Sequence, residues 1–111
     1  MWRLMATYEM EFMFDWLSGT CVWSVNAAAH ERYDYPVDLS ELPISPDLLK
    51  RLQGLVAWHD EALNWDDPGS GLIWDEAQIR EFDEKAIALH HELCEELGEE
   101  YEIKLFEGSQ V

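Results

Sequence analysis

The stretch that decides the fold is "WRLMATYEMEFMFDW", Trp2 to Trp16. Every even position in it is apolar, and most odd positions are polar or charged, with Met5 and Met13 as exceptions. A period of two is typical of a β-strand with one buried face. The "LSGT" that follows predicts a turn centred on Ser18-Gly19. The next segment, "CVWSV" at 21–25, predicts a second strand, which pairs with the first as an antiparallel hairpin.

Two helices are predicted in the second half of the chain. Ser45 is a good N-cap and Pro46 suits the first helical position. Apolar residues at helical spacing then extend this helix to Trp65, where "DDPGSG" ends it.

The second helix is predicted to begin after Asp75, because Asp75 and Gln78 resemble a capping box. Gly98 is a natural residue to end it. The segment "YEIKLFE", Tyr101 to Glu107, alternates in polarity again and predicts a last strand.

The segment from Asn26 to Pro43 shows little periodicity, although Tyr35 to Leu39 could add a short edge strand. The order of the other elements predicts the α+β class. We expect a small antiparallel β-sheet, made of the N-terminal hairpin and the C-terminal strand, packed on two α-helices. The length fits a single domain over residues 1–111.

The charge of the chain is strongly acidic. Its 24 Asp and Glu outnumber its 7 Lys and Arg, which gives a formal net charge of −17. From residue 60 to the end there are 16 acids and 3 bases. Such a field repels phosphate backbones and anionic membranes, so direct binding to nucleic acid or to a membrane surface is not expected. It attracts basic partners, although solubility is the simpler role for it.

The cysteines and the N-terminus indicate the compartment. Cys21 and Cys94 are far apart and lack a CxxC spacing, unlike the disulfide framework of a small secreted protein. No apolar run is long enough to span a membrane. The segment before the small residues 27–29 contains Glu9 and Glu11, which would disrupt the apolar core of a signal peptide. We therefore expect a cytoplasmic protein.

Metal ligation is a candidate chemistry for the histidines. His90 and Cys94 are four residues apart on the predicted second helix, and two ligands at that spacing can face one metal ion. A closed site needs four ligands, and neither this pair nor His59 with Asp60 or Glu61 matches a known ligand spacing. We expect no metal and no cofactor.

Enzyme chemistry has no stronger support in the sequence. Asp47 with Glu102 and Lys104 resembles the acidic pattern of metal-dependent nucleases, but the basic surface that would hold the substrate is missing. No nucleophile motif, phosphate-binding glycine loop or dinucleotide fingerprint occurs. We predict no catalytic residues.

The acidic turn after the first predicted helix is a candidate site for recognition. Asp66 and Asp67 would need a pocket that separates their pKa values to act as an acid–base pair, whereas turn carboxylates usually face water. Trp65 precedes them, with Asp60 and Glu61 close by in the sequence. Tryptophan is enriched at binding hot spots and carboxylates pair with Lys and Arg across interfaces, although core packing is an alternative role for the tryptophan.

These segments together resemble a known group of proteins. The strand "RLMATYE" leads to "CVW", "LPISPDL" then opens a helix that contains "AWHDEALNWDDP", and the second helix ends in "EELGEEYEI". The pattern is similar to that of small acidic bacterial immunity proteins of polymorphic toxin and contact-dependent growth inhibition systems. The resemblance covers nearly the whole chain, and the stretch from Asn26 to Asp38 departs from it.

The resemblance implies a protein that binds and neutralises a cognate secreted toxin domain without chemistry of its own. A toxin that acts on nucleic acid would carry a basic cleft, which an acidic partner can fill. The predicted contact residues are Asp60, Glu61, Trp65, Asp66 and Asp67, with Glu92, Glu95, Glu96 and Glu99 of the second helix.

Two other functions remain open. A DNA-mimic regulator would bind many basic nucleic-acid-binding proteins, and a small metal-binding protein or enzyme would use His90 and Cys94. The sequence leaves open whether the chain is a monomer or a dimer.

Overall fold

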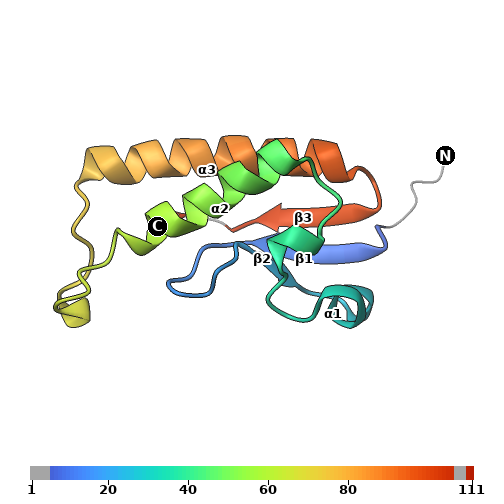
Figure 1. Cartoon of the computed structure of the whole chain (residues 1–111), viewed down its shortest axis with the longest axis horizontal. Helices are drawn as coiled ribbons and strands as arrows, with labels where there is room; N and C mark the ends of the chain where they lie inside the picture. Colours follow the sequence, from blue (N-terminus) through green and yellow to red (C-terminus); the bar gives the residue numbers. More distant parts are fainter. Residues whose placement is uncertain (1–5, 107–109) are drawn as a thin grey trace.

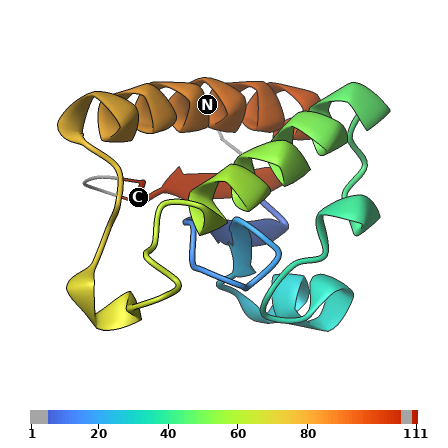
Figure 2. The ribbon, with the colours of Figure 1, turned by 60° about the vertical axis from the view of Figure 1, so that its left-hand side comes forward.

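The computed structural model describes residues 6–106 and 110–111. Helices α2 (Pro46–Asp60) and α3 (Glu76–Leu97) lie together on one face of a small sheet, and α1 (Ala27–Tyr33) lies at one edge of it, where Tyr33 packs on Tyr8 (Figures 1 and 2). The predicted α+β class is confirmed. In chain order the elements are β1 (Tyr8–Phe12), β2 (Val22–Ser24), α1 (Ala27–Tyr33), η1 (Leu39–Glu41), α2 (Pro46–Asp60), η2 (Pro68–Ser70), α3 (Glu76–Leu97) and β3 (Tyr101–Leu105).

The predicted N-terminal hairpin is confirmed in its central part. β1 pairs with β2 in antiparallel fashion, with Met10 opposite Ser24 and Phe12 opposite Val22. Met10 and Phe12 are buried, as their even positions predict. Residues 1–5, which open the predicted strand, and Glu107, which closes the last one, lie outside the described residues.

The prediction of an all-antiparallel sheet is wrong. The strand order is β2-β1-β3, and β3 runs parallel to β1, with Met10 opposite Ile103. Parallel neighbours require a crossover connection. Here the chain between β2 and β3 supplies it, because α2 and α3 cover the sheet and return the chain to the end at which β1 begins (Figure 1).

The segment from 26 to 43 contains a helix that the sequence did not predict. Asn26 caps α1, and its side-chain oxygen accepts hydrogen bonds from the N–H of Ala29 at 3.0 Å and from that of Glu9 at 3.2 Å. The edge strand expected at 35–39 is reduced to one bridge, between Trp23 and Pro36. The N–H of Val37 donates to the carbonyl of Val22 at 2.9 Å, so this segment still covers the outer edge of β2.

The starts of the two long helices agree with the predicted caps. The Ser45 hydroxyl accepts from the N–H of Leu48, and Asp75 and Gln78 form a complete capping box. The first helix, however, ends at Asp60 and not at Trp65. The chain beyond it pairs with itself instead, since Leu63 forms an antiparallel bridge with Leu72.

The buried side chains form one apolar cluster, to which the sheet, α1, α2 and α3 all contribute. Phe82 of α3 is fully buried at its centre. Its ring lies 5.0 Å from that of Phe14, 5.4 Å from that of Trp58 and 5.5 Å from that of Trp74, measured between centroids. Within the described residues, no helix has both the length and the apolar character needed to cross a membrane.

Candidate partner-binding surface

The acidic turn is held in shape by hydrogen bonds to the backbone and side chain of Asn64. The N–H of Asn64 donates to the carbonyl of Gly71 at 3.1 Å. The side-chain oxygen of Asn64 accepts from the N–H groups of Asp66 and Asp67 at 3.1 and 3.2 Å. Both aspartates are exposed, and no described residue donates a hydrogen bond to either carboxylate. The turn therefore presents two solvent-facing negative charges on an ordered backbone.

Asp60 ties this turn to the hairpin between β1 and β2. Its carboxylate accepts from the N–H of Leu17 at 2.9 Å, and its carbonyl accepts from the indole N–H of Trp65 at 2.6 Å. Leu17 has a positive φ of 63°, a conformation that is uncommon for a residue with a side chain. The predicted contact residue Asp60 thus has a structural role, because it holds the backbone of Leu17 and the side chain of Trp65 in place.

Apolar and acidic groups are exposed together at this end of the molecule. Leu17 is 76% exposed, Ile73 is 62% exposed and Trp65 is 46% exposed. Exposed apolar side chains beside charged ones are typical of protein-binding sites. We call this region the loop surface, made up of Leu17, Glu61, Trp65, Asp66, Asp67, Leu72 and Ile73.

The predicted contact residues on α3 form a second group. Glu92 accepts two hydrogen bonds from Arg51 of α2, at 2.7 and 2.8 Å, and this contact lowers the pKa of the Glu92 carboxyl. Glu96 accepts from the N–H and hydroxyl of Ser45, at 2.7 and 2.9 Å. Both side chains therefore join α3 to α2.

The other two acids of this group, Glu95 and Glu99, are exposed. Glu95 pairs with His91 one turn earlier, at 2.9 Å.

The structure brings together the members of each group but does not join the two groups. The loop surface lies next to the N-terminal end of α3. Glu92 to Glu99 lie at the C-terminal end of that helix (Figure 1). Residues 75 and 92 are about 25 Å apart along the helix axis, at 1.5 Å per residue. A single small cleft therefore contacts one group and not both.

The candidate metal ligands serve the fold. The ring nitrogen Nε2 of His90 lies 2.7 Å from the carbonyl oxygen of Ile103, so this nitrogen carries the proton and donates it. The Cys94 thiol lies 3.5 Å from the same nitrogen. Over residues 6–106 and 110–111, no three His, Cys, Asp or Glu side chains are grouped so that they could hold a metal ion.

His59 lies directly beneath the loop surface. It is 1% exposed, its ring stacks on that of Trp16 at 4.8 Å, and the carbonyl of His59 accepts from the Trp16 indole N–H. Its Nε2 atom is buried without a hydrogen-bond partner among the described residues. Burial lowers the pKa of His59, and the nearby carboxylates of Asp60 and Asp15 oppose this effect.

This environment predicts a loss of stability in mild acid. When the pH falls through the ordinary histidine pKa of about 6.5, the unfolded chain binds a proton at His59 that the folded chain does not. The wild-type free energy of unfolding should therefore fall, relative to that of His59→Leu, by at most ~1.4 kcal/mol per pH unit. Urea titrations over a pH series measure this difference. Parallel curves for wild type and His59→Leu would refute the assignment.

Two parts of the loop surface were not predicted from the sequence. Leu17 falls in the predicted turn, and Ile73 received no role. Their exposure follows from contacts between distant segments. The sequence did contain one local signal, because a leucine beside Ser18-Gly19 falls in a turn that exposes it.

Comparisons with known proteins identify the family of the chain. A family model described as Serratia CdiI immunity protein-like matches residues 4–108, which is nearly the whole chain. The comparison with curated proteins found no match.

Proposed function

Because the chain belongs to the Serratia CdiI immunity protein-like family, and is thus a toxin-neutralising immunity protein, we propose that it inhibits its cognate toxin domain through the loop surface. In this proposal the toxin presents a basic surface, such as the cleft of a nuclease. The chain acts in the cytoplasm as a binding protein without catalysis.

The asymmetry of charge supports this proposal most directly. Residues 60–111 contain 16 acids and only 3 bases. Three of these acids, Glu61, Asp66 and Asp67, belong to the loop surface. A concentration of one charge sign costs stability through self-repulsion. It also raises the rate at which a basic partner is captured and disfavours partners of the wrong charge. An inhibitor that must reach its toxin before the toxin acts gains directly from a fast association.

The apolar side chains of the same surface supply the attraction that charge alone does not. Solvent-exposed ion pairs contribute little to affinity, whereas a buried tryptophan can contribute several kcal/mol. Trp65 is held in place by the Asp60 carbonyl, so it loses little rotational freedom on binding. Leu17 and Ile73 lie nearby and extend the apolar contact.

Trp65→Ala should weaken the complex by about 30-fold, since truncation of a tryptophan hot spot costs about 2 kcal/mol or more. Stability should change little, because Trp65 is outside the buried cluster. Surface plasmon resonance with a catalytically inactive toxin domain measures the Kd. Phe106→Ala removes another exposed aromatic side chain, one outside the loop surface, and should bind as wild type does. Equal affinities for wild type and Trp65→Ala would exclude Trp65 as an anchor.

The neighbouring gene provides the test of the function itself. The C-terminal domain of a large secreted protein encoded next to this chain is expressed in cells with and without it. We expect the domain to stop growth, the chain to restore it, and the two proteins to form a one-to-one complex that weakens with added salt. Unrelieved toxicity would refute the proposal. Binding to many unrelated DNA-binding proteins, in competition with DNA, would instead support the DNA-mimic alternative.

A further inference from the structure

Leu17 is exposed in a backbone conformation that a leucine rarely adopts. It lies in the turn between β1 and β2, its φ is 63°, and its side chain is 76% exposed. A left-handed conformation brings the Cβ atom close to the following carbonyl oxygen, which costs free energy that a glycine does not incur. A side chain this exposed also leaves apolar surface in water. The fold therefore gains little from a leucine here, and a partner that binds the side chain would account for it.

The turn is fixed in this conformation on both sides of Leu17. It lies beside the C-terminal end of α2 (Figure 2), where the Leu17 N–H donates to the Asp60 carboxylate at 2.9 Å. The Trp16 indole N–H donates to a backbone carbonyl of α2 at 3.0 Å. The N–H and the hydroxyl of Ser18 both donate to the Asp15 carbonyl, at 3.3 and 2.8 Å. The free protein thus holds Leu17 in one place, so little conformational freedom is lost when a partner binds it.

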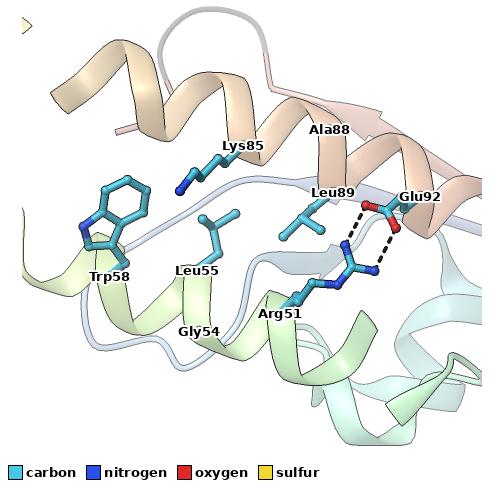
Figure 3. Close-up of a pocket in the computed structure, with 8 residues that line it drawn as sticks. All are labelled: Arg51, Gly54, Leu55, Trp58, Lys85, Ala88, Leu89 and Glu92. Atoms are coloured by element: carbon cyan, nitrogen blue, oxygen red, sulfur yellow. Dashed lines mark hydrogen bonds and ion pairs between the residues drawn. The ribbon is translucent and has the colours of Figure 1, made fainter. Parts of the chain in front are cut away.

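The charged side chains around this turn are all acidic. Residues 13–20 and 58–67, the two segments that meet here, contain no Lys or Arg. Their carboxylates are those of Asp15, Asp60, Glu61, Asp66 and Asp67. The apolar groove between α2 and α3 differs, because Arg51 and Lys85 line it (Figure 3). A partner that covers Leu17 therefore meets negative charge alone, which favours Lys or Arg on the partner at this place.

We propose that the cognate toxin domain has an apolar pocket that receives the Leu17 side chain, and that Lys or Arg side chains lie at the mouth of this pocket. This inference rests on the proposed function and names the part of the toxin that the loop surface fits. The leucine side chain fills the pocket, and the cations at its mouth lie against the carboxylates of Asp15 and Asp60. A domain without such a pocket, or with an acidic mouth, is rejected, so Leu17 determines specificity as well as affinity.

Removal of the side chain separates its role in binding from its role in the fold. We expect Leu17→Gly to raise the Kd for the inactive toxin domain at least about tenfold, because the pocket is left empty. The Tm of this variant should be no lower than that of wild type, because glycine adopts the same φ without strain. Ile87→Ala truncates another exposed apolar side chain, on α3 and outside the loop surface, and should bind as wild type does. Surface plasmon resonance and thermal denaturation measure the two quantities.

Two charged substitutions at the same position test the mouth of the pocket. Leu17→Lys and Leu17→Glu introduce polar side chains of similar length and opposite charge. We expect Leu17→Lys to bind at least about tenfold more weakly than Leu17→Glu at low salt, and the difference to shrink at high salt. Ile87→Lys and Ile87→Glu alter the net charge of the chain in the same way at a distant position, and their Kd values should differ much less.

The possible results separate this inference from the proposed function. A wild-type Kd in Leu17→Gly, or a Tm of that variant well below the wild-type value, would overturn the inference and leave the proposed function standing. Equal Kd values for Leu17→Lys and Leu17→Glu, or an equally large difference between the two Ile87 variants, would do the same. Failure of the wild-type chain to bind the toxin domain would overturn both.

Discussion

Reversing the charge of Asp66 and Asp67 is expected to raise the Kd for the cognate toxin domain by about 100-fold or more. The double variant Asp66→Lys/Asp67→Lys places two cations where we propose that a basic surface docks, and like charges across an interface cost several kcal/mol. The association rate should fall most, and the difference from wild type should shrink at high salt. Stopped-flow kinetics with the inactive toxin domain at two salt concentrations measures both effects.

The fold is expected to tolerate this change, which makes the result interpretable. The loop uses the backbone N–H groups of Asp66 and Asp67, not their carboxylates, to bond Asn64. Asp67 precedes η2 without a side-chain capping bond. Glu31→Lys/Glu41→Lys alters the net charge by the same amount at exposed positions of α1 and η1, on the other side of the molecule (Figure 1). If this control loses as much affinity as the loop variant, the effect is one of net charge and the loop surface is not the contact.

Phe82→Ala should destabilise the protein more than any surface change. Truncation of a fully buried phenylalanine costs about 3–5 kcal/mol, through lost apolar burial and the cavity that remains. The Phe82 ring contacts the rings of Phe14, Trp58 and Trp74, which lie after β1, in α2 and before α3. The substitution therefore removes a packing partner from three segments at once. A domain of this size has a total stability of about 5–15 kcal/mol. The variant should therefore be partly unfolded at 37 °C, as urea denaturation and near-ultraviolet circular dichroism will measure.

Ile87→Ala is the control on the same helix. Ile87 is 48% exposed, and such a position should change the free energy of unfolding by only about 0.5 kcal/mol. If Phe82→Ala were as stable as Ile87→Ala, the packing of Phe82 against Phe14, Trp58 and Trp74 would not be the centre of the core.

The features that the sequence predicts well are those that local interactions decide. The caps at Ser45 and Asp75 use atoms within three residues, and the alternation around Met10 depends only on which face of a strand is buried. The direction of β3 depends on how the two helices cross the sheet, which no local pattern contains. The seven-residue helix α1 is too short to be stable alone, and its cap residue Asn26 also bonds the distant Glu9.

The candidate site shows the same division. Asp66 and Asp67 could be identified because turn chemistry keeps them in water. That Glu92 is engaged by Arg51 could not be predicted, because the two residues are 41 positions apart and meet only when α2 packs on α3.

The central claim is that a toxin domain covers the loop surface. Hydrogen–deuterium exchange of the chain, free and bound to the inactive toxin domain, measures this most directly, because residues 61–73 lie between α2 and α3 and most of them are exposed. We predict slower exchange in this segment on binding, together with the turn at 16–19, while α1 exchanges as in the free chain. Unchanged exchange from 61 to 73 in a complex that neutralises the toxin would contradict the account.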